Sequence, residues 1–484
     1  MHPRVSELCE TIKAKKHDIR SLANFISTSF PTIDVFDWEE LKTLIVQTYE
    51  LSDADVDDFL RPPEFTKDGG YHDDFTPMLR ERGFSGFLRR YVDHLVHTET
   101  PAAFHFASGL AILAASLQRQ VWLDQQLYKI YPAIQILLLG PSGRTHKTTG
   151  AEHAIQHGEQ AQRFIRLADE ITPPQLRRTL SDITAKTGQA CALLYSSELS
   201  TLLGRQEYNE GLIQTLTDIY DARLKYEKDT KTAGKDTIKE MALTFLGCSN
   251  EGWASYSLPQ SSVTGGYVGR HLTFYQSGTN KRVPFPTFAD PEECGRLTSM
   301  LQLTAAVRGE FVLTPAARAW FIAKYDRICD NRPEDSDIDP FWARYGDHLM
   351  RLALLIRVSD IIAECYDKQG TISTIYHGID VIDFERADAL IKWLMRYLPR
   401  VHNFLGTSKF GSEYQRIILW IARNGGKVTD NQLGRAMSKY MSRKQLDEYV
   451  DSLVRNMTLK RRMLPPPHVD GASELTLTRK VEEL

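Results

Sequence analysis

The chain has 484 residues with a formal net charge of −3, and 42% of its residues are hydrophobic and 25% charged. This composition is typical of a globular protein with a sizeable core, and it excludes a disordered chain and an overall basic nucleic-acid-binding protein, although not a local basic surface. The six cysteines are scattered without a CxxC pair or a partnering histidine spacing, which argues against a disulfide scaffold and against a zinc site.

Residues 1–75 have a helical pattern with more carboxylates than cations, and we predict that they form an acidic helical N-terminal domain. The stretch 61–75 is rich in Pro, Gly and Asp, as linkers are. The acidic cluster at residues 72–74 could hold a metal, but a solvated linker is the simpler interpretation.

From residue 76 to 284 the pattern predicts an α/β core. Two helices, 87–97 and 101–117, form a helical collar before a series of short apolar strands. The predicted strands are residues 120–123, 134–139, 164–168, 190–195, 242–247 and 270–275. Short apolar strands that alternate with helices indicate a mostly parallel sheet with both faces covered.

The remainder of the chain is predicted to form two further units. Residues 285–405 have an all-helical pattern and would form a helical lid. Residues 406–484 show three helices, at 414–422, 431–440 and 443–456, followed by two short extended segments. Three helices and a β ribbon in this order are typical of a winged-helix domain.

The most informative segment is residues 134–150, IQILLLGPSGRTHKTTG. An apolar strand leads into a loop with two glycines, and a Lys–Thr pair opens the next helix. Such a loop turns its backbone amides toward phosphates, and the helix N-terminus adds partial positive charge. Lys147 would reach the β- and γ-phosphates of ATP, and the Thr148 hydroxyl would complete a Mg²⁺ shell. The other loop residues expected to contact the nucleotide are Gly140, Ser142, Gly143, Arg144, Thr145, His146 and Thr149.

The spacing of this loop differs from the usual GxxxxGK[ST] pattern. Gly140 precedes Lys147 by seven positions, and His146 occupies the place of the second glycine. We therefore expect a loop that is longer or differently turned. The alternative is a strand-to-helix turn with a coincidental Lys–Thr pair.

A phosphate-binding loop needs a carboxylate on a neighbouring strand to polarise water or hold the metal. The strand 190–195 is followed by Ser196, Ser197 and Glu198. Glu198 is the candidate for both tasks, although Ser197 stands where a second acid is usual. The alternative is a glutamate that starts a helix after a serine cap.

Two further polar positions are candidates for catalysis. The strand 242–247 is followed by Ser249 and Asn250, and an amide at that strand end could contact the γ-phosphate or orient the attacking water. Arg270 follows a glycine-rich turn and could act as an arginine finger on a neighbouring subunit's nucleotide. The alternatives are an ordinary turn-forming Asn and a structural arginine at a strand edge.

Two lysine- and arginine-rich stretches are candidates for DNA contact. Residues 223–239 read as a hairpin or mobile loop, with Lys228, Lys231 and Lys235 placed to follow a phosphate backbone. The C-terminal unit carries Arg443, Lys444 and Arg461 on its helices and wing. Solvated surface, in the first case, and a protein-docking surface, in the second, remain alternatives.

The segment FLRRYVDHLVHTETPAAFHFASGLAILAASLQRQVWL, followed by GPSGRTHKTT, SSELSTLL, LTFLGCSN and GGYVGRHLTFY, resembles the YfjI-like family of phage and prophage P-loop NTPases. Members are often described as replicative helicases or primase-helicase partners. The resemblance covers roughly residues 87–398 and rests on motif order. It implies an AAA+-like core of the helicase superfamily-3 type, in which a hairpin just before the sensor strand grips single-stranded DNA.

By that likeness Lys147 and Thr148 would be the phosphate and Mg²⁺ residues, Glu198 the catalytic carboxylate, Asn250 the sensor and Arg270 the finger. No primase-like carboxylate constellation is present in the sequence, so we do not expect primer synthesis by this chain.

The leading hypothesis is an ATP-dependent DNA motor of a phage or mobile element, a ring-forming, hexameric replicative helicase on single-stranded or forked DNA. A separate primase or initiator would be its partner. Without a signal peptide or an apolar run long enough for a bilayer, we expect it in the cytoplasm of a bacterial host, with no membrane partner. The second hypothesis is a nucleotide-regulated DNA-binding initiator or helicase-recruiting protein without motor activity. A DNA-packaging ATPase is disfavoured, because the chain lacks a nuclease carboxylate cluster.

Overall fold

The computed structural model describes residues 74–203, 206–230, 234–250, 254, 258, 266–279, 281–332, 339–370, 377–404, 417–418, 420–421, 424, 426–438, 440–455, 459–463 and 473–477. The acidic N-terminal domain expected over residues 1–75 lies outside the described residues except for its last two. The description therefore begins at helix α5 (Phe75–Glu81) and helix α6 (Gly86–His94).

The expected α/β core with a parallel sheet is confirmed. Its strands are β3 (Gln135–Leu139), β4 (Cys191–Ser196), β7 (Ala242–Ser249) and β8 (His271–Tyr275), in the order β4-β7-β3-β8. All three pairings are parallel. Every residue of these strands is buried, because helices cover both faces of the sheet, and this explains their nearly continuous apolar sequence.

The prediction of an independent strand at residues 164–168 is wrong. This segment forms only an isolated parallel bridge, Arg166 to Leu193, at the free edge of β4. The amide of Leu167 donates to the Leu193 carbonyl at 2.9 Å, and the Leu193 amide donates to the Ile165 carbonyl at 2.8 Å. Its side chains are mostly half-buried or exposed, since nothing in the described structure pairs with its outer edge, and the ladder ends after one rung.

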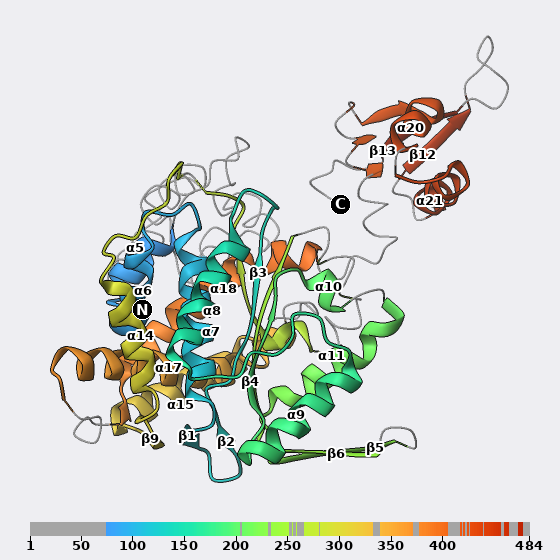
Figure 1. Ribbon diagram of the computed structural model, residues 1–484. Helices are drawn as coiled ribbons and strands as arrows, with labels where there is room; N and C mark the ends of the chain where they lie inside the picture. Colours follow the sequence, from blue (N-terminus) through green and yellow to red (C-terminus); the bar gives the residue numbers. More distant parts are fainter. Residues whose placement is uncertain are drawn as a thin grey trace.

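Two groups of helices cover the sheet (Figure 1). Helices α7 (Ala102–Leu117) and α8 (Lys147–Ala161) pack on one face, and α10 (Leu199–Leu203) and α11 (Gln206–Tyr220) pack on the other. Helix α7 begins after Pro101, contains no Asp, Glu, Lys or Arg, and is buried at all of its positions. A helix that is apolar all round belongs inside a core. No helix in the described ranges is long and apolar enough to cross a membrane.

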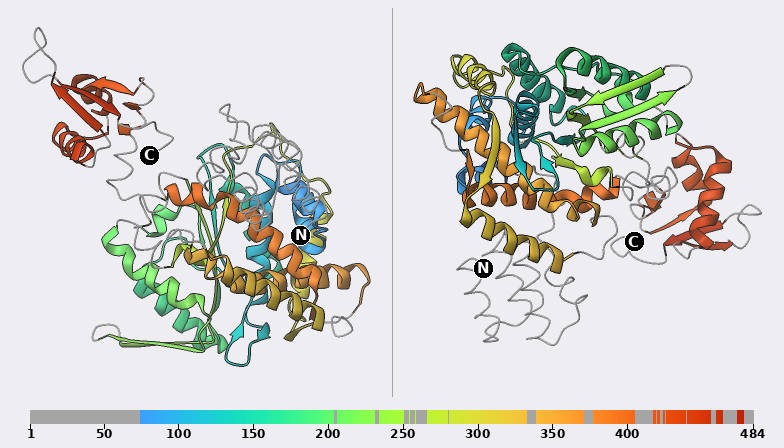
Figure 2. Two further views of the ribbon diagram at one scale, coloured as in Figure 1. Left: turned by 180° about the vertical axis from the view of Figure 1, so that it is seen from behind. Right: turned by 90° about the horizontal axis from the view of Figure 1, so that it is seen from below.

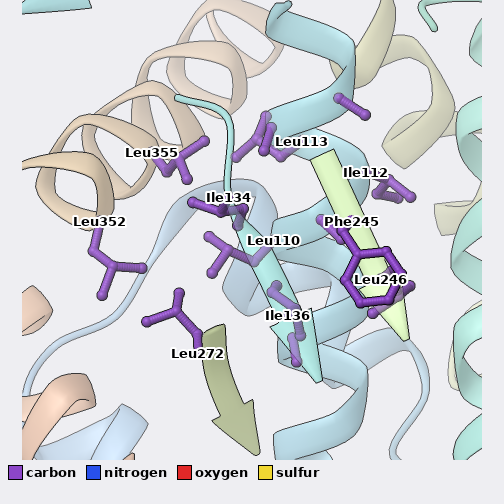
Figure 3. Close-up of a cluster of buried hydrophobic side chains, with 14 of the residues drawn as sticks. Leu110, Ile112, Leu113, Ile134, Ile136, Phe245, Leu246, Leu272, Leu352 and Leu355 are labelled. Atoms are coloured by element: carbon purple, nitrogen blue, oxygen red, sulfur yellow. The ribbon is translucent and has the colours of Figure 1, made fainter. Parts of the chain in front are cut away.

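The core forms where α7 meets the sheet and the long helix α17 (Tyr345–Asp367). Figure 3 shows Leu110 of α7 beside Ile136 of β3, with Leu113 of α7, Leu272 of β8 and Leu352 of α17 in the same cluster. All five side chains are fully buried. Each contributes roughly 1.5–3 kcal/mol through removal of apolar surface from water.

The hairpin expected over residues 223–239 is present as β5 (Lys225–Thr230) and β6 (Gly234–Lys239), paired antiparallel. β6 lies along helix α9 (Pro173–Thr187), where the Ser181 hydroxyl donates to the carbonyl of Thr237 and accepts from its amide, both at 3.2 Å. The hairpin forms an edge of the molecule (Figure 2). It leads directly into β7, as the position of the segment in the sequence predicts.

The all-helical pattern expected for residues 285–405 is wrong in one respect. Helices α14 (Glu293–Leu303), α15 (Pro315–Asp330), α16 (Asp339–Trp342), α17 and α18 (Val381–Phe404) are present. Between them, β9 (Gly309–Leu313) pairs parallel with β1 (Val121–Asp124) and with β10 (Gly378–Ile379), and β2 (Lys129–Ile130) completes this second sheet. Phe311 is buried while its neighbours are not, which is the alternation of a half-buried strand.

The C-terminal unit has its own small core. It contains β11 (Lys427–Thr429), α20 (Asp430–Met437), α21 (Arg443–Arg455), β12 (Leu459–Met463) and β13 (Ser473–Leu477), and its antiparallel sheet has the order β11-β13-β12. A reciprocal Thr429–Gln432 capping box starts α20. The two later helices and the ribbon were predicted; β11 was not, and the first predicted helix lies only partly within the described residues.

Candidate functional site

The carboxyl ends of β3 and β7 form a topological switch point of the parallel sheet. From β3 the chain leads through α8 toward the β4 edge, whereas from β7 it leads to β8 on the other side of β3. In open α/β sheets ligands bind where neighbouring strands lead in opposite directions. Gly140, Glu198 and Asn250 follow β3, β4 and β7. Because the strands are parallel, all three lie at the carboxyl ends of the strands.

Gly140 is the point where the chain leaves β3. Its amide donates to the Ser249 carbonyl at 3.3 Å, and a Cβ at this position would lie 2.4 Å from the backbone oxygen of Gln276, which follows β8. Only glycine fits between the ends of the two neighbouring strands. Three residues later Gly143 adopts a left-handed backbone with φ of +71°, which turns the loop back toward the helix.

His146 occupies the position of the second glycine and adopts the conformation that glycine would supply. Its φ of 45° and ψ of 34° are left-handed, at a cost of about 1–2 kcal/mol for a residue with a Cβ. Two side chains from the turn before α7 hold it: the Thr100 hydroxyl donates to the His146 carbonyl at 3.1 Å, and a Glu99 carboxylate oxygen lies 2.9 Å from its Nε2. These two contacts were not anticipated, because 46 residues separate Thr100 from His146.

The loop and the first turn of α8 present a row of free donors. The backbone amides of residues 146–149 have no backbone acceptor among the described residues. The N-terminal end of a helix carries a partial positive charge, and unpaired amides in that position bind anions. Thr148 is half-buried in the first turn, while Ser142, Arg144 and Thr149 are exposed. Thr145 is fully buried and donates to the Pro141 carbonyl at 3.2 Å, so its hydroxyl braces the loop.

Lys147 is the buried cation of the site. Its side chain is 6% exposed, and Nζ donates to the Gly140 carbonyl at 3.1 Å. Burial lowers the pKa of this ammonium, and the nearby Cys248 and Glu198 oppose that shift. No carboxylate of the described residues forms an ion pair with Lys147. A buried ammonium that has only a carbonyl partner favours an incoming anion.

Glu198 faces this cation from the end of β4. The Ser249 hydroxyl donates to its Oε1 at 2.9 Å, and the Ser196 hydroxyl donates to its backbone carbonyl at 2.9 Å. Asn250 reaches the phosphate loop itself, where its Nδ2 donates to the Ser142 hydroxyl at 3.3 Å. The structure therefore brings together the predicted loop, the predicted carboxylate and the predicted sensor.

Arg270 does not join this group. It lies just before β8, whose first residue His271 pairs with Gln135 at the start of β3. Arg270 is therefore at the amino ends of the strands, whereas Gly140 is at their carboxyl ends. Its guanidinium donates to the Gly266 carbonyl at 2.9 Å and lies 5.6 Å from the centroid of the Tyr220 ring. Burial and the neighbouring Arg344 lower its pKa. Any nucleotide contact by Arg270 would therefore be with a second subunit.

The candidate DNA-binding residues differ in whether their side chains are exposed or form ion pairs within the chain. Lys228 on β5 is exposed, and Lys235 on β6 pairs through its backbone with Asp229, while Lys231 lies outside the described residues. In the C-terminal unit, Lys444 is exposed. Arg443 forms an ion pair with Asp447 at 3.1 Å, and Arg461 pairs with Asp451 at 2.6 Å.

No family model matches the chain. A search among curated proteins finds no matching relative either. Among solved structures, the chain is similar to one described as the structure of Drosophila ORC bound to DNA, at 13% sequence identity and a TM-score of 0.20, over 92% of this chain and 97% of the other. A similarity at this TM-score carries no conclusion about fold or function.

The oxygen-bearing side chains at this switch point also fit a magnesium ion. Mg²⁺ prefers hard oxygen ligands and usually combines one or two carboxylates with hydroxyls, water and phosphate oxygens. Thr148 and Glu198 offer a hydroxyl and a carboxylate at the same edge of the sheet. Ser197, half-buried beside Glu198, supplies no second carboxylate.

Proposed function

We propose that this chain binds ATP and Mg²⁺ at the end of β3 and hydrolyses the nucleotide. The observation that carries the proposal is Lys147, buried at the first position of α8 beside a row of unpaired amides, with Glu198 nearby on β4. A triphosphate would satisfy the amides and the ammonium at once.

Each residue of the proposed nucleotide site has a chemical task. The amides of residues 146–149 and Lys147 bind the phosphates, and Thr148 and Glu198 hold the metal, which would neutralise charge developing on the phosphate oxygens. Glu198 accepts a proton from the attacking water while Ser249 fixes the orientation of its carboxylate. Asn250 stands over the loop where a γ-phosphate would replace Ser142 as its partner.

The arrangement of the other elements supports a motor that acts on DNA. The β5–β6 hairpin runs directly into β7, which ends at Ser249 and is followed by Asn250. β7 therefore joins the proposed nucleotide site to the hairpin, whose first strand carries the exposed Lys228. We therefore propose an AAA+-like helicase core with a C-terminal winged helix, assembled as a hexameric ring on single-stranded or forked DNA. Arg270 would then act on the nucleotide of the neighbouring subunit, and a separate primase or initiator would be the partner.

Two observations favour a second candidate. Ser197 provides no second acid, and the ammonium of Lys147 is turned onto its own loop at Gly140. These features suit a nucleotide-regulated initiator or helicase-recruiting protein that binds ATP without steady turnover. Hydrolysis that is stimulated by single-stranded DNA favours the motor; tight binding with no turnover favours the initiator.

The direct test is the Lys147→Ala variant. Removal of a buried, charge-assisted phosphate contact costs about 1.5–3 kcal/mol, so we expect ATP affinity to fall at least about tenfold in a calorimetric titration with Mg²⁺ present. The matched control is Lys186→Ala in the last turn of α9, which should bind ATP as the unmodified protein does. An unchanged ATP affinity in the Lys147 variant, with an intact circular dichroism spectrum, would refute this site.

A further inference from the structure

A cluster of metal-binding side chains lies outside the proposed nucleotide site. It consists of His94 at the end of α6, His157 in α8 and Cys294 in α14. Their ligand atoms all lie within 4.8 Å of one another, and Sγ of Cys294 is 3.7 Å from Nε2 of His157. Three helices that are distant in the sequence thus converge on one point.

The two histidines are buried, and one of them lacks hydrogen-bond partners. His94 and His157 are each 2% exposed, and neither ring nitrogen of His94 has a hydrogen-bond partner among the described residues. A neutral imidazole always carries one N–H donor and one acceptor nitrogen, and leaving both unsatisfied in a core costs about 1–3 kcal/mol each. A metal ion at the cluster would satisfy the acceptor.

Neighbouring side chains hold both rings in place. Nδ1 of His157 lies 3.3 Å from the Thr298 hydroxyl, which leaves Nε2 for a metal. Phe288 stacks on His94 with ring centroids 4.7 Å apart.

We propose that His94, His157 and Cys294 bind one Zn²⁺ ion. Imidazole nitrogen with thiolate sulfur is the donor set that Zn²⁺ takes in tetrahedral sites, and it suits neither Mg²⁺ nor Ca²⁺. Metal–ligand lengths of about 2.0–2.3 Å place neighbouring ligand atoms of a tetrahedron about 3.5 Å apart, close to the observed Sγ–Nε2 separation. The partly exposed Cys294 marks the open side, where water takes the fourth position.

The site would act as a cross-link. α8 begins at the phosphate loop with Lys147 and carries His157 three turns later, while α6 belongs to the collar and α14 to the region after residue 285. A bound ion therefore fixes the helix that follows the phosphate loop against both neighbours. The inference does not depend on nucleotide binding.

Cobalt provides the sharpest test, since Co²⁺ replaces Zn²⁺ and a Co²⁺–thiolate bond absorbs in the near ultraviolet. The full chain, without a histidine tag, is freed of metal with a chelator and titrated with CoCl₂. We expect a thiolate charge-transfer band that saturates at one equivalent and is bleached by ZnCl₂. Cys294→Ser should lose this band, and the control Cys329→Ser, at an exposed cysteine of α15, should keep it.

Thermal unfolding supplies a second measurement that does not depend on absorbance. At a Zn²⁺ concentration about 100 times the dissociation constant, the midpoint of unmodified protein should rise by about 5 °C, and that of Cys294→Ser should not change. The Ser variant differs by one atom, so a native circular dichroism spectrum is expected. No band with unmodified protein, or the same band and shift with Cys294→Ser, would overturn the proposal; the latter result would place the ion elsewhere.

Discussion

Ser249 at the end of β7 donates its hydroxyl proton to Oε1 of Glu198, which follows β4, at 2.9 Å. β7 is the strand between the proposed catalytic carboxylate and the phosphate loop. A residue of the intervening strand therefore fixes the orientation of the Glu198 carboxylate. This hydrogen bond links β7 to Glu198.

Removing that hydroxyl should slow catalysis without weakening ATP binding. In Ser249→Ala, Glu198 loses the donor that fixes its rotamer, and we expect kcat for ATP hydrolysis to fall about tenfold, equivalent to about 1.4 kcal/mol, with KM within twofold. Ser197→Ala serves as the control, because no side-chain hydrogen bond is described for Ser197. If kcat is unchanged, Ser249 has no positioning role.

The tight fit at Gly140 predicts a steric penalty. A methyl group there would lie 2.4 Å from the Gln276 backbone oxygen, and the strand ends must separate to admit it. Gly140→Ala should lower the free energy of unfolding by about 1–3 kcal/mol and reduce ATP affinity. Gly295→Ala in α14, where a Cβ would meet nothing within 4 Å, should instead be neutral or stabilising by up to about 1 kcal/mol. Equal urea midpoints for the two variants would contradict this account.

Charge reversal on the hairpin tests the DNA interface. In Lys228→Glu with Lys235→Glu, we expect weaker binding of single-stranded DNA and an unchanged basal ATPase rate. The slope of log affinity against log salt should decrease by about 1.4, or 0.7 for each lost phosphate contact. Lys368→Glu, at an exposed lysine of the C-cap of α17 paired with Glu364, should leave both quantities unaltered. If the hairpin variant binds single-stranded DNA as tightly as the unmodified protein does, β5 and β6 are excluded from the interface.

Asp383 predicts an unusual dependence of stability on pH. Burial raises its pKa from 3.8 to about 6, so the folded protein retains a proton that the unfolded chain releases. Its contribution is therefore favourable below pH 4 and is lost as the pH rises from about 4 to about 6. Asp383→Asn keeps an acceptor for the Asp380 amide, at 2.8 Å from Oδ2 in the unmodified protein.

At pH 7 the Asp383→Asn variant should be more stable by up to about 3 kcal/mol, and the difference should shrink toward zero near pH 4. Urea unfolding of both proteins across this pH range measures it. A variant that is equally stable or less stable at pH 7 would show that the carboxylate is stabilised in its charged form.

Much of the core and of the candidate site followed from local sequence patterns. Four apolar strands were recognised by their continuous hydrophobic runs, and the polar residues directly after them, Glu198 and Asn250, had to share an edge once the sheet was parallel. The edge segment around Arg166 was overpredicted, because an apolar–polar alternation does not reveal that one rung is all that forms.

Other features depend on contacts that no local pattern encodes. His146 has the backbone conformation of a glycine only because Glu99 and Thr100 hold it, and one helix and three strands lie between those residues and His146. The scattered cysteines argued against a zinc site, yet folding places Cys294 beside His157, 137 positions away. Spacing rules detect metal ligands on one turn or hairpin and miss those that three helices bring together.

The pairing of β9 with β1 changes what the helices after residue 285 can do. A lid moves as a hinged flap only if covalent linkers are its main attachment, but here Val121, Trp122 and Leu123 share a parallel ladder with Gly309, Glu310 and Phe311. Opening such a flap would break ladder bonds and expose Phe311, so the ladder resists this movement. If these chains assemble into the proposed ring, mechanical work is then expected to arise from sliding between adjacent protomers, not from hinge movements within each protomer.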